Sequence, residues 1–168
     1  MRETPDALYL TTLEEATACF LNLNITKINL DQLGLPALRI QLQTKLPLAS
    51  YPNDPPKCFR CGKPTTRHYT SMANRNGNQG RPYFKCMGCN EFLVFADARG
   101  NYPTSQLCDC KQSCKLLLTG VNKAICGRAF YCCRLGTCDT YEPWTDNKGR
   151  PVAIDSTLYY ELRYLDII

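Results

Sequence analysis

The chain has 168 residues and a mass of 19.0 kDa, which fits one ordinary domain or two to three very small ones. Hydrophobic residues make up 44% and charged residues 21%, a composition that indicates a folded protein and argues against a disordered chain. The sequence contains no run of about eighteen apolar residues, so we expect no membrane partner. The formal net charge of +5 comes from the middle of the chain, because residues 51–100 carry 8 basic and 3 acidic side chains and residues 101–150 carry 7 and 4.

The chain holds 12 cysteines, and all but Cys19 lie between Cys58 and Cys138. Residues 1–10 lack an apolar core and do not predict a secretory signal. Since reducing compartments do not keep disulfides, cysteines in a chain without an export signal typically bind metal. We therefore expect a nuclear or cytoplasmic metal-binding protein, and a secreted disulfide scaffold is disfavoured.

The pattern of residues 1–46 predicts a helical N-terminal segment. Thr12 and Glu15 have the spacing of a capping box, and Pro36 suits the first turn of a second helix that Pro47 would stop. These apolar helices are also candidates for docking a protein partner. The apolar residues at helical spacing are Leu13, Ala16, Phe20 and Leu23 in the first helix and Leu38, Leu42 and Leu46 in the second.

Two further segments flank the cysteine-rich region. Residues 47–57 hold four prolines, which exclude a helix or an inner strand and predict a semi-rigid linker. Residues 151–168 form a C-terminal segment, in which the stretch from Leu158 to Leu165 fits either a short helix or a strand. We expect the N-terminal and C-terminal segments to serve packing rather than function.

A strong zinc-binding pattern follows the linker. Cys58 and Cys61 form one C-x2-C pair, and 24 residues later Cys86 and Cys89 form another. Two such pairs make tight knuckles that meet around one tetrahedral ion. His68, the only histidine, is an alternative ligand because neutral imidazole also binds zinc. Since four cysteines already have suitable spacing, the pattern favours a four-thiolate site.

The same pattern occurs twice in the chain. Residues 80–86 (Gly-Arg-Pro-Tyr-Phe-Lys-Cys) are echoed by residues 127–133 (Gly-Arg-Ala-Phe-Tyr-Cys-Cys). A preserved order at a period of about fifty residues indicates two copies of one module, over residues 58–100 and 101–150. Three later residues recur at a displacement of 49 residues: Cys89 as Cys138, Phe95 as Trp144, and Asp97 as Asp146.

The second copy offers seven cysteines for four ligand positions. The repeat selects Cys133 and Cys138 as one pair. Cys108-x-Cys110 stands 22 residues before Cys133, in the place of the other pair. We therefore expect two zinc ions per chain, one in each copy. The cysteines that compete with Cys108 to complete the second site are Cys114 and Cys126.

In both copies the first cysteines are followed by Gly-Arg-x-aromatic-aromatic-x-Cys, then by a further cysteine and an aromatic-x-Asp ending. On these motifs, residues 58–150 resemble tandem GRF-type zinc fingers. The resemblance implies two small antiparallel three-stranded sheets, each stabilised by zinc, and an α+β protein once the helical N-terminal segment is included. It also implies binding of single-stranded nucleic acid, because similar modules do so as appendages of topoisomerases, abasic-site endonucleases and DNA glycosylases.

The candidate nucleic-acid contacts are an arginine and neighbouring side chains in each copy. A guanidinium grips phosphate or stacks on a base, and an exposed ring offers a stacking platform worth about 1–3 kcal/mol per base. Alternation along a strand turns one ring of each pair toward the core. The alternative is that both rings pack around zinc while the arginine braces the fold. The candidates are Arg81, Tyr83, Phe84 and Lys85 in the first copy and Arg128, Phe130, Tyr131 and Trp144 in the second.

Zinc reduces the positive charge that nucleic acid would meet. Four thiolates and one zinc ion sum to a charge of −2, so two sites lower the formal charge of the chain from +5 to +1. We therefore expect modest, salt-sensitive binding, with DNA and RNA both open. The main alternative is a protein–protein adaptor with purely structural zinc. An enzyme is disfavoured, because one histidine and filled zinc coordination offer little for acid–base or hydrolytic chemistry.

Overall fold

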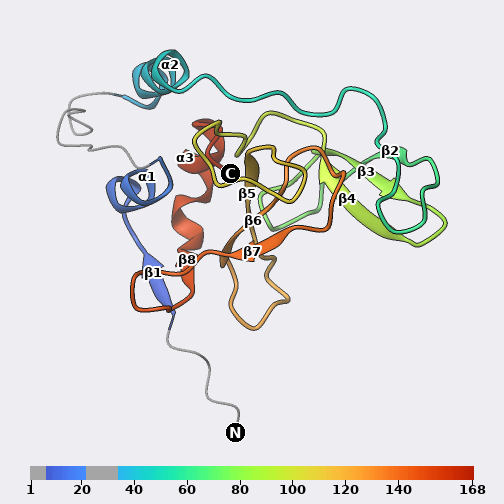
Figure 1. The fold of residues 1–168 in the computed structure, drawn as a ribbon. Helices are drawn as coiled ribbons and strands as arrows, with labels where there is room; N and C mark the ends of the chain where they lie inside the picture. The colour runs from blue at the N-terminus through green and yellow to red at the C-terminus, as the bar shows by residue number, and fades with distance from the viewer. Residues whose placement is uncertain (1–6, 22–33) are drawn as a thin grey trace, which may run out of the picture.

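A computed structural model describes residues 7–21 and 34–168, and Figure 1 shows their arrangement. The N-terminal elements are β1 (Leu8–Leu10), α1 (Leu13–Leu21) and α2 (Leu35–Lys45). Two groups of three strands follow: β2 (Thr66–Tyr69), β3 (Pro82–Cys86) and β4 (Glu91–Phe95), then β5 (Cys114–Leu118), β6 (Ala129–Cys133) and β7 (Tyr141–Pro143). The chain continues with β8 (Val152–Ile154), the 3-10 turn η3 (Ser156–Leu158) and α3 (Tyr159–Tyr164).

The prediction of an α+β protein with two three-stranded antiparallel sheets is confirmed. The first sheet has the order β2-β3-β4, and the second has the order β5-β6-β7. We call residues 55–99, which contain the first sheet, ribbon 1, and residues 101–150, which contain the second, ribbon 2. The sheet of ribbon 1 lies at one end of the molecule and helix α1 at the other, with ribbon 2 and α3 between them (Figure 1).

The strand registers align the two ribbons residue by residue. Tyr83 of β3 pairs with Phe95 of β4, whereas Phe130 of β6 pairs with Pro143 of β7. A register shift between Phe84 and Lys85 leaves one extra residue in β4, and the β6–β7 pairing has no such shift. The structural counterpart of Phe95 is therefore Pro143, and the predicted equivalence of Phe95 with Trp144 is wrong by one residue.

The N-terminal helices begin and end close to where their signals predict. The Glu15 N–H donates to the Thr12 hydroxyl at 3.1 Å, and the Glu15 carboxylate accepts from the Thr12 N–H at 3.2 Å, which completes the reciprocal capping box. Helix α2 carries Pro36 in its first turn and ends at Lys45. Leu23, predicted to continue the first helix, lies outside the described residues. Among the described helices, none is long and apolar enough to cross a membrane.

Both ends of the chain pack against ribbon 2. Strand β1 pairs in parallel with β8, so the N-terminal and C-terminal segments meet in one small sheet. The C-terminal stretch that fitted a helix or a strand forms a helix, α3. One apolar core includes buried residues of α1, α2, β8, α3 and ribbon 2, among them Phe20, Leu42, Val152, Leu162 and Tyr131. Ribbon 2 is therefore part of a larger folded unit rather than an isolated finger.

Ribbon 1 has a separate, smaller core and a close contact with ribbon 2. Its buried residues include Phe84, Val94 and the zinc-site cysteines Cys58 and Cys86. Gly136 of ribbon 2 has a φ of +67°, and a Cβ there would come within 2.8 Å of the Val94 side chain. Glycine is required at this position because any side chain would separate the two ribbons.

The proline-rich linker forms no helix and no named strand, and it is anchored to ribbon 2. The Ala49 N–H donates to the Asn101 carbonyl at 2.7 Å. The buried guanidinium of Arg134 donates to the Ser50 carbonyl at 2.6 Å. These long-range bonds hold the linker along ribbon 2 and thereby restrict how ribbon 1 is presented.

Candidate metal centres and nucleic-acid surface

The four cysteines of the first predicted zinc site converge in ribbon 1. Cys58 and Cys61 lie in a turn before β2, Cys86 ends β3, and Cys89 lies in the turn to β4. Their Sγ atoms all lie within 4.8 Å of one another. The Sγ–Sγ distances are 3.8 Å for Cys58–Cys89, 3.6 Å for Cys61–Cys86 and 3.7 Å for Cys86–Cys89. A tetrahedron with Zn–S bonds of about 2.3 Å has edges of about 3.8 Å, so the donor set fits zinc.

Backbone N–H groups support this donor set. The Cys89 N–H hydrogen-bonds to the Cys86 sulfur and, together with the Cys61 and Cys89 thiols and the Gly88 N–H, outweighs burial and lowers the pKa of the Cys86 thiol to about 7. The first knuckle closes through the Gly62 N–H, which donates to the Cys58 carbonyl at 2.8 Å. The thiolate form that a metal requires is thus stabilised by the turn itself.

The second donor set is formed by Cys108, Cys110, Cys133 and Cys138 of ribbon 2, whose Sγ atoms also lie within 4.8 Å of one another. The Sγ–Sγ distance is 3.0 Å for Cys108–Cys110, 3.9 Å for Cys108–Cys133 and 3.7 Å for Cys110–Cys133. Burial raises the pKa of Cys133, but hydrogen bonds from Thr137 and from backbone N–H groups outweigh burial and lower the pKa to about 6. This set has the four thiols that a structural zinc site needs.

The alternatives left open by the sequence are placed elsewhere. Cys114 is buried on β5 opposite Cys133, and the Cys126 sulfur lies 3.9 Å from the Tyr159 hydroxyl, outside the donor set. The His68 ring interacts with the Thr66 hydroxyl at 2.8 Å and joins neither cysteine cluster. Cys108 therefore completes the second set, and the alternative of His68 as a ligand is wrong.

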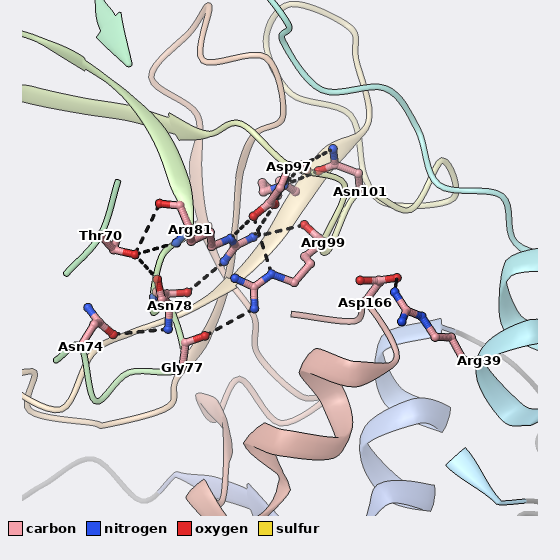
Figure 2. Close-up of polar contacts among 11 residues, drawn as sticks. Arg39, Thr70, Asn74, Gly77, Asn78, Arg81, Asp97, Arg99, Asn101 and Asp166 are labelled. Atoms are coloured by element: carbon pink, nitrogen blue, oxygen red, sulfur yellow. Dashed lines mark hydrogen bonds and ion pairs between the residues drawn. The ribbon is translucent and has the colours of Figure 1, made fainter. Parts of the chain in front are cut away.

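Arg81, the leading candidate for a nucleic-acid contact, is buried. Its side chain is 2% exposed, and its guanidinium pairs with the Asp97 carboxylate, with Nη2 donating to Oδ1 at 2.9 Å. Nη1 donates to the Asn78 side chain at 3.0 Å, as Figure 2 shows. The prediction that Arg81 contacts nucleic acid is contradicted, because its side chain is buried and each of its three guanidinium nitrogens donates inside the protein. The structure matches the alternative in which this arginine braces the fold.

The aromatic pairs alternate as expected for strands. Phe84 and Tyr131 are buried, whereas Tyr83 and Phe130 are half-buried on the opposite faces of β3 and β6. Their burial removes Phe84 and Tyr131 as base contacts, which corrects those two predictions. Lys85 is also half-buried and lines the same surface groove as Tyr83.

The remaining candidates of ribbon 2 serve mainly in packing. Trp144 stacks on Tyr131 at 5.1 Å and meets Phe20 edge-on at 5.0 Å, so the indole belongs to the core contact with α1. It packs on Tyr131, on the face of β6 opposite Phe130, and its predicted contact with nucleic acid stays a prediction. Arg128 is half-buried, and its Nε is buried with no hydrogen-bond partner among the described residues.

Ribbon 1 carries a cluster of aromatic rings. Of these rings, only Tyr83 was among the nucleic-acid contacts predicted from the sequence. Tyr83 stacks on His68 at 5.5 Å, and Phe92 lies 5.6 Å from Tyr83 and 5.0 Å from Phe95. We call His68, Tyr83, Phe92 and Phe95 the aromatic face. Phe92 is 40% exposed and Phe95 is buried beneath it.

The alternation of side chains along a regular strand does not predict this cluster. Phe92 and Phe95 are three residues apart, a spacing that places side chains on opposite faces of a regular strand. The extra residue at the register shift in β4 returns both rings to one face. In ribbon 2, Phe130 similarly meets the exposed ring of Tyr141 at 4.9 Å.

Asp97 joins the two ribbons through a buried ionic network. Besides pairing with Arg81, its carboxylate accepts from the Lys115 ammonium at 3.1 Å, and Lys115 is fully buried on β5. Burial raises the pKa of Asp97, but the Arg81 hydrogen bonds and the positive charges of Lys115 and Arg81 outweigh it and lower the pKa to about 2. Asp146, the sequence counterpart of Asp97, instead pairs with Arg150.

Comparison with known proteins supports these centres. Residues 55–99 match the family model described as the GRF-like zinc ribbon domain. The match covers ribbon 1 alone, and ribbon 2 shares with it the three-stranded sheet and a cluster of four cysteines. Comparison with curated proteins and with solved structures finds no significant match. The chain therefore contains a zinc-binding GRF-like zinc ribbon at residues 55–99, followed by a second four-cysteine module.

Proposed function

We propose that this protein is a non-enzymatic, zinc-dependent binding protein that holds single-stranded nucleic acid on the aromatic face of ribbon 1. The observation that carries the proposal is the clustering of three accessible rings, His68, Tyr83 and Phe92, on one side of a small sheet. Accessible rings on a sheet are stacking platforms for unpaired bases, each worth about 1–3 kcal/mol.

The surroundings of the aromatic face fit single-stranded rather than double-stranded nucleic acid. An open groove of about 410 Å³ runs beside it and is lined by Tyr83, Phe92 and Lys85, together with the polar side chains of Ser71 and Asn74. Lys85 can meet a phosphate while the neighbouring rings stack on bases. No basic helix for a major groove is found among the described helices, which favours unpaired over paired nucleic acid.

The buried Arg81 supports this face from below. Its Cζ atom lies 3.9 Å from the centroid of the Phe95 ring, and its ion pair with Asp97 fixes that position. Phe95 in turn packs against Phe92, so the arginine positions the rings without touching the ligand. Zinc has the same kind of role here, because four thiolates complete its coordination and it holds the strands in place.

The alternative of a protein–protein adaptor is less well supported than nucleic-acid binding, because the helices expected to dock a partner use their apolar side chains within the protein. Phe20, Leu38 and Leu42 point their apolar side chains into the protein's own core. Ile40 is the large apolar residue that α2 leaves exposed. A single exposed side chain is common on protein surfaces and does not indicate an interface.

The proposal is tested by fluorescence anisotropy with single-stranded DNA, single-stranded RNA and duplex DNA at two salt concentrations. Tyr83→Ala should weaken single-strand binding by about tenfold, the effect of one lost stacking contact. Arg67→Ala is the matched control, because this exposed arginine lies over Phe84 on the opposite face of the sheet. Equal binding of duplex, or equal effects of the two variants, would contradict the assignment of the aromatic face.

A further inference from the structure

A cavity of about 220 Å³ lies between ribbon 1, ribbon 2 and helix α3. Phe92 and Phe95 line it from ribbon 1, Phe130 from ribbon 2, and Arg163 from α3. Because Phe92 and Phe95 also belong to the aromatic face, the cavity adjoins the proposed path of the nucleic-acid strand. Its volume is below the roughly 300–1,000 Å³ of pockets for drug-sized ligands, so it suits a single planar ring system.

Part of the cavity lining is polar and is ordered by hydrogen bonds. Asn76 and Asn78 line the cavity, and their loop is held by Asn74, whose side-chain oxygen accepts from the Asn76 N–H at 2.8 Å. The same oxygen accepts from the Asn78 N–H at 3.3 Å (Figure 2). The Asn78 side-chain oxygen accepts from Arg81, and this hydrogen bond fixes the orientation of the amide group. The amide NH2 group is thereby left as a donor. A lining that combines aromatic rings with amide groups matches the faces and edges of a nucleobase.

At the same place, basic side chains outnumber the carboxylate that pairs with them. Arg81, Arg99 and Lys115 all pair with the one carboxylate of Asp97. Arg163 adds a fourth cation, because it lines the same open depression as Arg99. Within the described part of the chain, Arg163 forms no ion pair, and its Nε is buried without a hydrogen-bond partner. Such a surplus of partly buried cations favours a bound anion.

Arg163 stands at the boundary between the cavity and this cationic surface. It lines the apolar cavity and also a second, open depression shared with Arg99 and Tyr160. Arg99 is held toward this boundary by its Nη1, which donates to the Gly77 carbonyl at 3.4 Å (Figure 2). A ligand with a flat ring system and an attached anionic group would place the first in the cavity and the second on the two arginines.

We propose that this cavity binds one unstacked nucleobase of a single strand, with the adjoining phosphate on Arg163 and Arg99. The inference rests on the proposed function and adds a base-binding subsite between the two ribbons. It also assigns a ligand contact to the C-terminal segment. The nucleic-acid strand would therefore contact the aromatic face, the cavity and α3.

The direct test uses the zinc-loaded full chain and follows its amide and side-chain N–H signals by NMR. Adenosine 5′-monophosphate should shift the signals of Asn76, Asn78 and Arg163. Adenosine alone and inorganic phosphate alone should each bind at least about tenfold more weakly than the mononucleotide, because each supplies only one of the two groups that the site contacts. Shifts confined to residues outside the cavity would overturn the proposal.

The second test separates this inference from the proposed function. Leu118, a half-buried cavity residue, is changed to Trp to fill the space, and Arg163 is changed to Ala, with zinc content and circular dichroism confirming the fold. Each change should weaken single-strand binding by about tenfold, and Arg163→Lys should restore part of the loss.

The pattern of losses decides between the two ideas, because Tyr83 lines the groove of the aromatic face but not the cavity. Loss of binding with Tyr83→Ala but not with Leu118→Trp or Arg163→Ala would overturn the cavity subsite and keep the aromatic face. Loss with the cavity variants alone would support the cavity and overturn the face as the main site. Binding of the mononucleotide without binding of any strand would overturn the link between the two.

Discussion

The ammonium group of Lys115 lies 3.1 Å from the carboxylate of Asp97, and this contact ties ribbon 2 to ribbon 1. Lys115 also donates to the Asp97 carbonyl at 2.7 Å and to the Asn101 side chain at 2.9 Å. Three acceptors thus meet the three N–H groups of the ammonium. Burial lowers the pKa of Lys115, and the Asp97 carboxylate opposes that shift. A fully buried lysine is tolerated here because each of its N–H groups has an acceptor and one of these acceptors is a carboxylate.

Asp97→Asn should destabilise the protein, because it leaves Arg81 and Lys115 without their shared counter-charge. Breaking one side of a buried ion pair costs about 3–5 kcal/mol, and the lower end applies since Asp97 retains 20% side-chain exposure. Urea unfolding at fixed zinc concentration measures the free energy. Lys115→Met in the Asp97→Asn background should recover part of the loss. A single-variant effect below about 1 kcal/mol would show that the contact does not hold the ribbons together.

The protein should bind two zinc ions per chain, which elemental analysis measures directly. Cys86→Ser removes one of the four donors of ribbon 1 and should reduce the content to one ion, because the second donor set lies in a separate core. Cys133→Ser should be more damaging to the whole fold, since Cys133 belongs to the core that includes both chain ends. A parent protein with a single zinc ion would contradict the assignment of ribbon 2 as a metal site.

The site in ribbon 1 should release zinc before the site in ribbon 2 when the pH falls. Protons compete with zinc for the thiolates, so a donor set that solvent reaches more easily loses its ion at a higher pH. Cys61 and Cys89 of the first site are exposed, whereas no ligand of the second site is. A chelator-based release assay between pH 8 and pH 5, with Cys86→Ser identifying the first ion, gives the order. Simultaneous release would mean that the two ribbons unfold as one unit.

Arg81→Ala should lower both the free energy of unfolding and the affinity for single strands. The buried guanidinium bonds Asp97 and supports Phe95, so its loss leaves an unpaired carboxylate and loosens the aromatic face. A loss of about 3 kcal/mol of stability is expected. Tyr83→Ala, in contrast, should lower affinity with a stability change of less than about 1 kcal/mol, since Tyr83 is half-buried on the surface. Denaturation and anisotropy on the same preparations separate the two effects. If Arg81→Ala weakened binding at unchanged stability, the arginine would be a contact residue instead.

Local patterns of the sequence were sufficient to predict several parts of the structure. The two cysteine sets, the repeated strands and the capping box of Thr12 and Glu15 depend on residues that are close in sequence or repeat at a fixed spacing. Their geometry follows from short turns and strand alternation, which leave few arrangements open. The choice of Cys108 over Cys114 and Cys126 already required the three-dimensional structure.

The roles of other residues were decided only by contacts between distant segments. Arg81 is buried because Asp97 lies across the sheet from it, and Lys115 is buried because it meets Asp97 from the other ribbon. One extra residue in β4 places Phe92 and Phe95 on the same face, against the alternation that the sequence predicts. Sequence spacing therefore determined the four ligands of the first zinc site and all but one of the second. Burial and long-range pairing, which no local pattern encodes, determined which charges and rings remain at the surface to meet a ligand.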